Sequence, residues 1–365
     1  MTRVILDGLV KRYDRIAVVD GASLEVHPGE LTVVLGPSGA GKTTLARLIA
    51  GLEPPDAGEV YFDGRVMNAS PPEARRVGLV FQDDALWPHL TVGENVGYGL
   101  KVKGIRRRDR RRQVAQALEA ARIDALADRR PETLSGLQRQ RAALARALVI
   151  EPEVLILDEP FGRLEPRVRD DLRDDLRRLH AEGRMTTLLL THDPREALAM
   201  ADRLAIMDLG RIVQAGPPDE VYNRPSDAFV AQFLGPANLL HGQVEGVGAD
   251  GRGEVIVRTP LGRLLGHALA GAPPQGAPVT VAIRPEVLTF GTPVPAGSNR
   301  FIATLERQDF LGETRRIHLR GPGDWPVTAL ALQGQSRGLR EGQSLTVSVP
   351  PDQVIILPGK YAALG

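Results

Sequence analysis

The sequence predicts an α/β domain built on a parallel sheet, followed by a smaller all-β domain. Three observations support this fold class. Short apolar runs alternate with helical patterns over residues 1–235, a glycine-rich motif joins one of these runs to a helix, and helical periodicity stops after residue 235. We therefore expect an α/β domain at residues 1–235 and a β-barrel or sandwich at residues 236–365.

Composition limits the class of protein. The 365 residues suffice for two domains, and 46 Lys and Arg against 45 Asp and Glu argue against a general nucleic-acid binder. The absence of cysteine excludes disulfides, thiol catalysis and cysteine zinc sites. No apolar stretch reaches the about 18 residues of a membrane span, and Asp7 interrupts the N-terminal apolar residues too early for a signal peptide. We expect a soluble, cytoplasmic protein.

The strands of the first domain are predicted in two groups. Residues 17–20 and 60–62 are predicted antiparallel strands, and Asp63-Gly64 after the second is a hairpin-turn pair. Strands buried on both faces of a parallel sheet are short and almost wholly apolar. Three later runs have this composition, at residues 77–81, 154–157 and 187–190. The helical patterns between them predict right-handed crossovers.

Residues 36–44 match the phosphate-binding loop consensus G-x-x-x-x-G-K-[ST]. The loop comprises Gly36, Pro37, Ser38, Gly39, Ala40, Gly41, Lys42, Thr43 and Thr44. A predicted buried strand at 31–35 precedes it and a helical pattern at 44–50 follows. In such a loop the backbone N–H groups surround phosphate oxygens, the lysine reaches the β- and γ-phosphates, and the threonine hydroxyl helps hold Mg²⁺. The sequence therefore predicts a P-loop that binds a nucleoside triphosphate with Mg²⁺.

Asp158 and Glu159 follow the predicted strand at 154–157. Both carboxylates are then expected at the carboxyl edge of the sheet, where the phosphate loop also lies. We expect Asp158 to orient Mg²⁺ and Glu159 to act as general base toward the attacking water. Gln82, at the end of the strand at 77–81, can reach both Mg²⁺ and that water. The alternative is a pair of solvated acids at a strand end.

Two further side chains are candidates for contact with the nucleotide. His192 follows the strand at 187–190, and Asp193-Pro194 with Glu196 form an expected helix start with an N-cap, a proline at the first position and a glutamate at the third. This would hold His192 at the sheet edge, facing the γ-phosphate. Tyr13, upstream of the loop, can stack on an adenine ring.

Residues 134–138 read Leu-Ser-Gly-Leu-Gln and open a predicted helix that continues to residue 148. Ser135 and Gln138 have the spacing of a capping box, which by itself only starts a helix. A capped N-terminus with Gly136 in its first turn also presents free N–H groups to a phosphate. Both interpretations need the same local geometry.

An internal repeat supports two similar halves in the all-β domain. The segment at 275–286 resembles the segment at 341–352, 66 positions later, in its Gly, β-branched strand and Pro pattern. Two five-strand halves are the simplest interpretation, and a chance resemblance in a Val/Pro/Gly-rich region is the alternative.

Taken in order, these motifs resemble those of the ATP-binding subunit of ABC transporters. The resemblance covers residues 1 to about 235 and implies a helical subdomain at about 85–150. It also implies that two copies, or this chain and a paralogue, sandwich two ATP molecules. Ser135, Gly136 and Gln138 of one copy then contact the γ-phosphate held by Lys42 and Thr43 of the other. Catalytic roles are implied for Glu159, His192 and Gln82, and Mg²⁺ contacts for Thr43, Gln82 and Asp158.

The C-terminal part, with Arg284-Pro285-Glu286 after a predicted strand, resembles the oligonucleotide-binding-fold (TOBE-like) extension of importer ATPases. This resemblance implies solute import of a polyamine, ferric iron, sulfate, molybdate, phosphonate or sugar. It further implies transmembrane permease subunits, an indirect extracytoplasmic binding protein, no nucleic acid, and a peripheral location at the cytoplasmic face of the inner membrane.

Two departures from the family pattern concern the expected dimer. Leu137 replaces the second glycine of L-S-G-G-Q, and Gly162-Arg163-Leu164-Glu165 stands where S-A-L-D is usual. Both put cross-dimer contacts in question.

Two surface features have open interpretations. The basic run at 106–112 is either a solvated helix face or a contact for anionic lipid headgroups. Trp87 is either part of a permease-binding surface or local core. Two other functions are also possible: a soluble ABC ATPase in translation or DNA repair, and a regulatory module in which the C-terminal domain holds the ATPase open.

Overall fold

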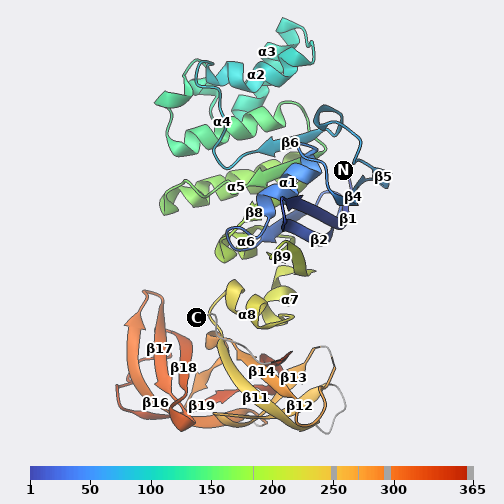
Figure 1. The fold of residues 1–365 in the computed structure, drawn as a ribbon. Coiled ribbons are helices and arrows are strands. Elements are labelled where there is room, and N and C mark those ends of the chain that lie inside the picture. Colours follow the sequence, from blue (N-terminus) through green and yellow to red (C-terminus); the bar gives the residue numbers. More distant parts are fainter. Residues whose placement is uncertain (184, 248–252, 270, 292–296, 360–365) are drawn as a thin grey trace. The chain divides into compact units, whose positions relative to one another are not determined.

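The computed structural model describes residues 1–183, 185–247, 253–269, 271–291 and 297–359 (Figure 1). The chain divides into two compact units, Met1–Pro218 and Asp219–Gly365. This division lies before the expected limit at residue 235 because α7 (Pro218–Asn223) and α8 (Ala228–Leu234) group with the β-rich unit. The domain limits of 1–235 and 236–365 therefore stay a prediction.

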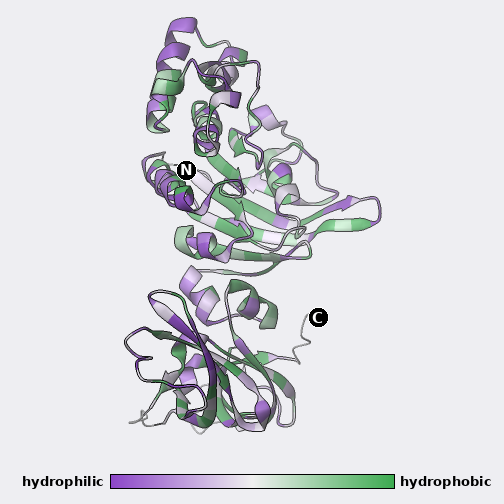
Figure 2. Ribbon diagram, turned by 90° about the vertical axis from the view of Figure 1, so that its left-hand side faces the viewer, coloured by the Kyte–Doolittle hydropathy of each residue, from purple (hydrophilic) through white to green (hydrophobic). Residues whose placement is uncertain are grey.

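A six-stranded sheet forms the centre of the first unit, in the order β10-β9-β3-β8-β7-β6. Its strands are β3 (Leu31–Leu35), β6 (Val77–Val80), β7 (Val154–Asp158), β8 (Thr186–Thr191), β9 (Arg203–Asp208) and β10 (Arg211–Gly216). All pairings are parallel except that of β9 with β10. Every residue of β3, β7 and β8 is buried, and Figure 2 colours these central strands largely hydrophobic. The predicted parallel sheet is confirmed.

A second, antiparallel sheet has the order β2-β1-β4-β5. Its strands are β1 (Val4–Tyr13), β2 (Ile16–Val26), β4 (Ala57–Phe62) and β5 (Arg65–Val66). Asp63 and Gly64 join the last two with φ values of 48° and 78°, the positive pair that a tight hairpin turn needs. Side chains of both sheets share one apolar core with α1 (Lys42–Ala50), which includes Leu6, Leu48 and Ile156.

Three helices form a separate group in the first unit, seen together in Figure 1: α2 (Val92–Val102), α3 (Arg107–Ala120) and α4 (Gly136–Leu148). They have their own apolar core, in which Val96, Leu118 and Ala142 are buried. These helices fall within the expected helical subdomain at 85–150. Two more helices, α5 (Pro166–Gly183) and α6 (Pro194–Met200), follow β7 and β8, and short 3₁₀ turns lie at Pro72–Ala74, Asp124–Leu126 and Pro131–Thr133.

The second unit contains a closed five-stranded barrel and a five-stranded sheet. The barrel strands are β11 (Asn238–Val247), β12 (Glu254–Thr259), β13 (Gly262–Ala268), β14 (Pro278–Ile283) and β20 (Val354–Pro358). The sheet strands are β15 (Thr289–Phe290), β16 (Asn299–Phe310), β17 (Thr314–Arg320), β18 (Pro326–Leu332) and β19 (Ser344–Val349). One apolar core, with Val281 from the barrel and Val347 from the sheet, serves both. The two predicted five-strand halves are confirmed.

The repeat has a structural counterpart. In each copy a strand ends in a 3₁₀ turn that starts with proline, at Pro285–Val287 after β14 and at Pro351–Gln353 after β19. The chain then crosses to the other half, because β15 pairs with β19 and β20 pairs with β14. The repeated sequence therefore exchanges one strand in each direction between the barrel and the sheet. A further 3₁₀ turn lies at Pro322–Asp324.

Candidate functional site

The phosphate loop joins β3 to α1, as the motif predicts. Two of its glycines are needed for close packing. A Cβ at Gly36 would lie 2.3 Å from the carbonyl oxygen of Met207, and one at Gly41 would lie 2.4 Å from that of Val18. Gly41 also has a φ of 100°, in the region that favours glycine. The loop is thus fixed between backbone segments of β2 and β9.

A cavity of about 290 Å³ opens beside this loop. Its lining comprises Val18, Ser38, Gly39, Gly41, Lys42, Thr43, Thr44, Gln82 and Glu159. Gln82 and Glu159 come from the ends of β6 and β7 and meet the loop there, as expected. Val18 was not predicted, because its position depends on the packing of β2 against the loop and no local motif signals it.

Lys42 is buried at the start of α1. Its Nζ donates to the carbonyl oxygens of Gly36 at 2.8 Å and Pro37 at 3.0 Å, and it lies 3.6 Å from Oε1 of Glu159. Burial lowers the pKa of Lys42, and the charge of Glu159 opposes this shift. The ammonium group is therefore held over the loop, between backbone oxygens and a carboxylate.

Two other predicted residues, Gln82 and His192, contact the side chain of Glu159. Its Oε2 accepts a hydrogen bond from Nε2 of Gln82 at 3.1 Å, and its Oε1 lies 3.1 Å from Nδ1 of His192. Its backbone has a φ of 48°, a left-handed conformation that is uncommon outside glycine. Strained conformations of this kind concentrate at functional sites. The arrangement presents a carboxylate that can take a proton, with two side chains that fix its orientation.

Asp158 is suited to bind a cation that the phosphates of the nucleotide also bind. Its side chain is buried, and its Oδ1 has no hydrogen-bond partner. Burial raises the pKa of Asp158, and a hydrogen bond with the Thr43 side chain opposes this shift. Over the described part of the chain, no group of three or more His, Cys, Asp or Glu residues could hold a metal alone. Mg²⁺ usually needs only one or two carboxylates when substrate phosphates supply the other ligands, so these residues fit Mg²⁺.

The segment after Gln82 is anchored by α4. Asp84 and Ala85 have φ values of 61° and 46°, and the guanidinium of Arg146 donates to the carbonyl oxygens of both, at 2.8 Å for Asp84. Nε of Arg139 lies 3.5 Å from Oδ2 of Asp84. Sequence reasoning missed these arginines because basic residues on a helix give no signal of a distant loop partner.

The N-terminus of α4 forms the predicted capping box. The Ser135 hydroxyl accepts from the N–H of Gln138 at 3.3 Å, and Oε1 of Gln138 accepts from the N–H of Ser135 at 2.9 Å. Gly136 and Leu137 are half-buried in its first turn. None of these residues lines the cavity beside the phosphate loop. The structure therefore establishes the capping role, and the expected phosphate contact stays a prediction.

The helix start at residue 193 is only partly as predicted. Asp193 caps α6 through the N–H of Arg195 at 2.8 Å, with proline at the first helical position. Glu196 is the third helical residue, as predicted, but its carboxylate does not turn back to the N-cap. Its side chain turns inward instead, where Oε2 accepts from the Thr191 hydroxyl at 2.7 Å and Oε1 lies 3.2 Å from Nη1 of Arg169. The hydrogen bond from Arg169 is charge-assisted, which makes it one of the stronger kinds.

Tyr13 ends β1 near α1, with 41 % of its surface exposed. Its hydroxyl hydrogen-bonds Glu53, and this bond raises the pKa of Tyr13, whereas a hydrogen bond with Thr44 opposes the shift. The ring thus lies beside the last residue of the phosphate loop. Its stacking on adenine stays a prediction.

The fold and this site define a P-loop nucleotide triphosphatase. Residues 19–162 match the family model described as ABC transporter, and residues 281–357 match the TOBE domain. The chain belongs to the ABC transporter family, as an importer-type ATPase with a C-terminal TOBE domain. No helix in the described ranges is long and apolar enough to cross a membrane.

Three curated relatives match nearly the whole chain. The spermidine/putrescine import ATP-binding protein PotA of Rubrobacter xylanophilus is 40 % identical over 360 residues, covering 98 % of this chain and 94 % of that protein. The sulfate/thiosulfate import ATP-binding protein CysA of Ralstonia nicotianae is 41 % identical, covering 93 % and 92 %. The sn-glycerol-3-phosphate import ATP-binding protein UgpC 1 of Rhizobium johnstonii is 38 % identical, covering 97 % and 94 %.

A solved structure supports the fold of the first unit. It is the ATP-binding cassette MJ0796, described as a dimeric post-hydrolysis state bound to ADP and Pi. The match has a TM-score of 0.54 and 30 % identity, and covers 59 % of this chain and 98 % of that one.

Proposed function

We propose that two copies of this chain, or one copy and a paralogue, hydrolyse ATP at composite sites and thereby drive solute import through a membrane permease. One observation supports this most. Two catalytic candidates, Gln82 and Glu159, line the cavity beside the phosphate loop, whereas Ser135, Gly136 and Gln138 lie outside its lining. A second copy can supply them. The dimeric state described for MJ0796 with ADP and Pi supports the same arrangement.

The chemistry follows from the residues at the cavity. The loop N–H groups and Lys42 bind the phosphates, and Glu159 accepts a proton as water attacks the γ-phosphorus. The bond between the γ-phosphorus and the bridging oxygen breaks, which releases ADP and phosphate. Gln82 and His192 orient Glu159 through contacts of 3.1 Å each. Thr43, Gln82 and Asp158 would hold Mg²⁺, which would neutralise charge on the phosphate oxygens.

The dimer is tested by the dependence of hydrolysis on protein concentration. If the site is composite, specific activity rises with concentration until the dimer is saturated, and Ser135→Ala mixed with Lys42→Ala restores part of the activity that each variant lacks. A rate per chain that is independent of concentration, together with failure of this complementation, would contradict the composite site.

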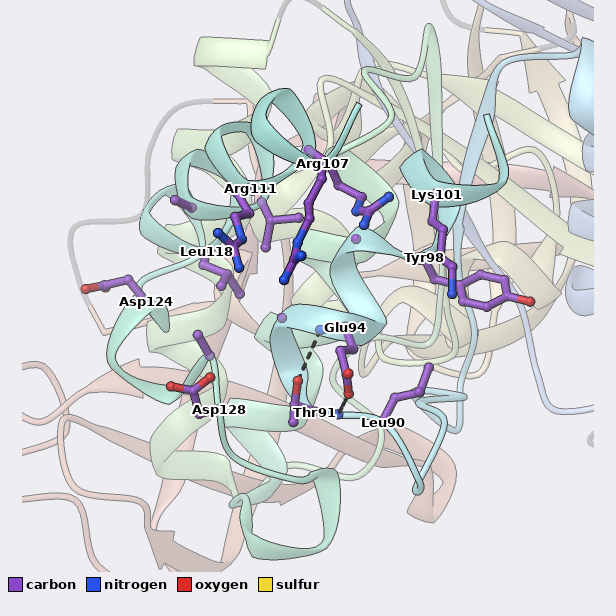
Figure 3. A pocket seen from close by; sticks show the side chains of 16 residues that line it. Leu90, Thr91, Glu94, Tyr98, Lys101, Arg107, Arg111, Leu118, Asp124 and Asp128 are labelled. Carbon is purple, nitrogen blue, oxygen red and sulfur yellow. Dashed lines mark hydrogen bonds between the residues drawn. The ribbon is translucent and has the colours of Figure 1, made fainter. Parts of the chain in front are cut away.

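We further propose that the permease binds at a groove in the helical group. This groove, of about 640 Å³, lies between α2 and α3, and Figure 3 shows long basic side chains of α3 reaching toward α2. Its cationic lining residues are Lys101, Arg107, Arg110 and Arg111. Among the residues that the structure describes, none pairs with any of these four as an ion pair.

Trp87 lies near this surface and packs against its neighbours, and its place in a permease-binding surface stays a proposal. It is half-buried, its ring lies 4.5 Å from that of Tyr98, which lines the groove, and the guanidinium of Arg146 lies 5.1 Å from it. Trp87 therefore packs locally and supports one wall of the proposed permease surface.

A charge-reversal pair tests the docking surface. Arg107→Glu with Arg111→Glu changes the groove, whereas Arg108→Glu with Arg112→Glu changes the same helix outside its lining. We expect the first pair to abolish co-purification with the permease and the second to retain it, with the ATPase activity of the free subunit unchanged in both. Equal loss of membrane association in both pairs would instead favour anionic lipid as the ligand of the basic run.

The transported solute is a separate matter. The named relatives serve a polyamine, a phosphate ester and sulfate, and these share no single chemical class. We therefore propose an importer without assigning its substrate. An extracytoplasmic binding protein and a location at the cytoplasmic face of the inner membrane complete the proposal. Mass spectrometry of the complex purified from membranes would identify the permease, and purification without a permease would favour a soluble ABC ATPase in translation or DNA repair.

A further inference from the structure

Arg169 contacts two loops that flank the candidate site. It lies in the first turn of α5, after the loop at residues 162–165. Its Nε donates to the carbonyl oxygen of Leu164 at 3.1 Å. Its Nη1 lies 3.2 Å from Oε1 of Glu196 and 3.5 Å from Oδ2 of Asp193. One guanidinium therefore connects the loop after Glu159 with the helix start after His192.

The second of these loops is held on both sides of His192. Glu196, with only 11 % of its side chain exposed, accepts a hydrogen bond from the hydroxyl of Thr191 at 2.7 Å. The same hydroxyl accepts from the N–H of Asp193 at 3.1 Å. Thr191 and Asp193 are the two chain neighbours of His192, so the Glu196 carboxylate fixes the backbone from which the imidazole extends.

The contacts continue to the general base. Nδ1 of His192 lies 3.1 Å from Oε1 of Glu159, although half of the His192 side chain is exposed. An exposed side chain has few packing contacts of its own to fix it, so its direction depends on its backbone. Polar contacts thus run from Leu164 through Arg169 and Glu196 to Thr191 and Asp193, and the backbone joins these two residues to His192.

We propose that Arg169 is a positioning residue that couples the loop at 162–165 to the orientation of His192 against Glu159. This inference rests on the proposed roles of His192 and Glu159 in hydrolysis. The loop at 162–165 is where cross-dimer contacts are expected. A displacement of this loop on dimer closure therefore reaches His192 through a side chain of the same copy.

The geometry explains why arginine is needed here. A guanidinium offers N–H groups in a planar fork, so Nε binds one loop while Nη1 binds the other. An ammonium group is a single point charge on a flexible stem and cannot span both acceptors with fixed directions. We therefore expect Arg169→Lys to resemble Arg169→Ala in hydrolysis.

A double-mutant cycle in the full-length chain separates positioning from general stabilisation. The variants are Arg169→Ala, His192→Ala and their combination, and the control is Arg173→Ala. Arg173 lies on the same helix and pairs with the exposed Asp170 at 2.7 Å, so its loss also removes one ion pair. Single-turnover hydrolysis and ATP affinity are measured for each variant, with thermal melting as a check of folding.

We expect Arg169→Ala to lower the single-turnover rate by about 10- to 100-fold, the loss that misplacing a catalytic group by about 1 Å causes. ATP affinity changes by less than about twofold, because Arg169 touches no residue of the phosphate cavity, and the control stays near wild type. In the His192→Ala background, the same substitution changes the rate by less than about twofold, since the group it positions is absent.

Two results would overturn the inference: wild-type turnover in Arg169→Ala, or an equal fold-loss with and without His192. If Arg169→Ala melts below the assay temperature, Glu196→Gln replaces it, because that change keeps the side-chain volume and removes the charge. Wild-type turnover in His192→Ala alone would contradict the proposed role of His192 and would be recognised separately from a failure of Arg169.

Discussion

Glu159→Gln isolates one step of the proposed chemistry. The substitution keeps the volume of the side chain, and the amide can still pair with Gln82 and His192, whose contacting atoms lie 3.1 Å from the carboxylate oxygens. It removes the proton acceptor and the negative charge. A change in hydrolysis therefore reports the loss of the general base, and not the loss of local structure.

The expected size of the effect follows from two contributions. Loss of a general base lowers the rate by about 10²- to 10⁴-fold, which raises the barrier by about 3 to 5 kcal/mol. Binding behaves differently. At 3.6 Å, the attraction between Lys42 and Glu159 is about 4 to 5 kcal/mol at an effective dielectric constant of about 20, before desolvation. The neutral amide does not compete with the γ-phosphate for Lys42, so ATP affinity stays equal or rises.

The assay is single-turnover hydrolysis with excess enzyme, beside equilibrium binding of ATP. Glu182→Gln is the matched control, because Glu182 is an acid on α5 with 61 % of its side chain exposed. We expect slow hydrolysis, tight binding and accumulation of the ATP-bound dimer for Glu159→Gln only. Turnover within about threefold of wild type, less than any general base supplies, would exclude Glu159 as the base.

Three further outcomes are expected. Gly41→Ala should abolish ATP binding while the chain stays folded, because the added Cβ would lie 2.4 Å from the backbone carbonyl oxygen of Val18. Isothermal titration calorimetry measures ATP binding, and binding retained in this variant would refute the packing argument. Asp175→Asn should lower the free energy of unfolding by about 3 to 5 kcal/mol, because the buried Asp175 carboxylate accepts two hydrogen bonds from Arg141 and would lose its charge. Urea titration measures this change, with Asp170→Asn as the exposed control. Burial, with a hydrogen bond to Glu286, raises the pKa of Tyr222 from 10.0 to about 12. The folded state therefore keeps the phenol proton to a higher pH than the unfolded state, and the free energy of unfolding should fall as pH rises from 10 to 12. Tyr222→Phe should remove this pH dependence in chemical denaturation, and an unchanged slope of stability against pH would contradict the argument.

Much of the fold was predictable because its signals are local. Continuous apolar runs identified β3, β7 and β8, and the Asp63-Gly64 pair identified the hairpin between β4 and β5. The spacing of Ser135 and Gln138 predicted the capping box at the start of α4. Backbone conformation and burial pattern follow from the nearest few residues, so periodicity and cap chemistry suffice for them.

Part of the candidate site was predictable for a related reason. Strand ends of a parallel sheet meet at one edge, so acids, amides and a histidine that follow such strands converge there. Glu159, Gln82 and His192 do converge, although Gln82 lies 77 positions from Glu159. The phosphate loop needed no tertiary information, since its glycines and lysine form one continuous motif.

Contacts between distant segments required the tertiary structure. The sequence placed Glu196 in the first turn of a helix, but its partners Arg169, from α5, and Thr191, from β8, appear only in the structure. Likewise, nothing local marked Val18 as a wall of the cavity or Arg146 as the anchor of the segment after Gln82. By itself the sequence indicated the candidate residues for the chemistry, through short-range patterns. Only the tertiary structure decided which side chains hold them in place, because those partners are chosen by strand order and helix packing over long separations.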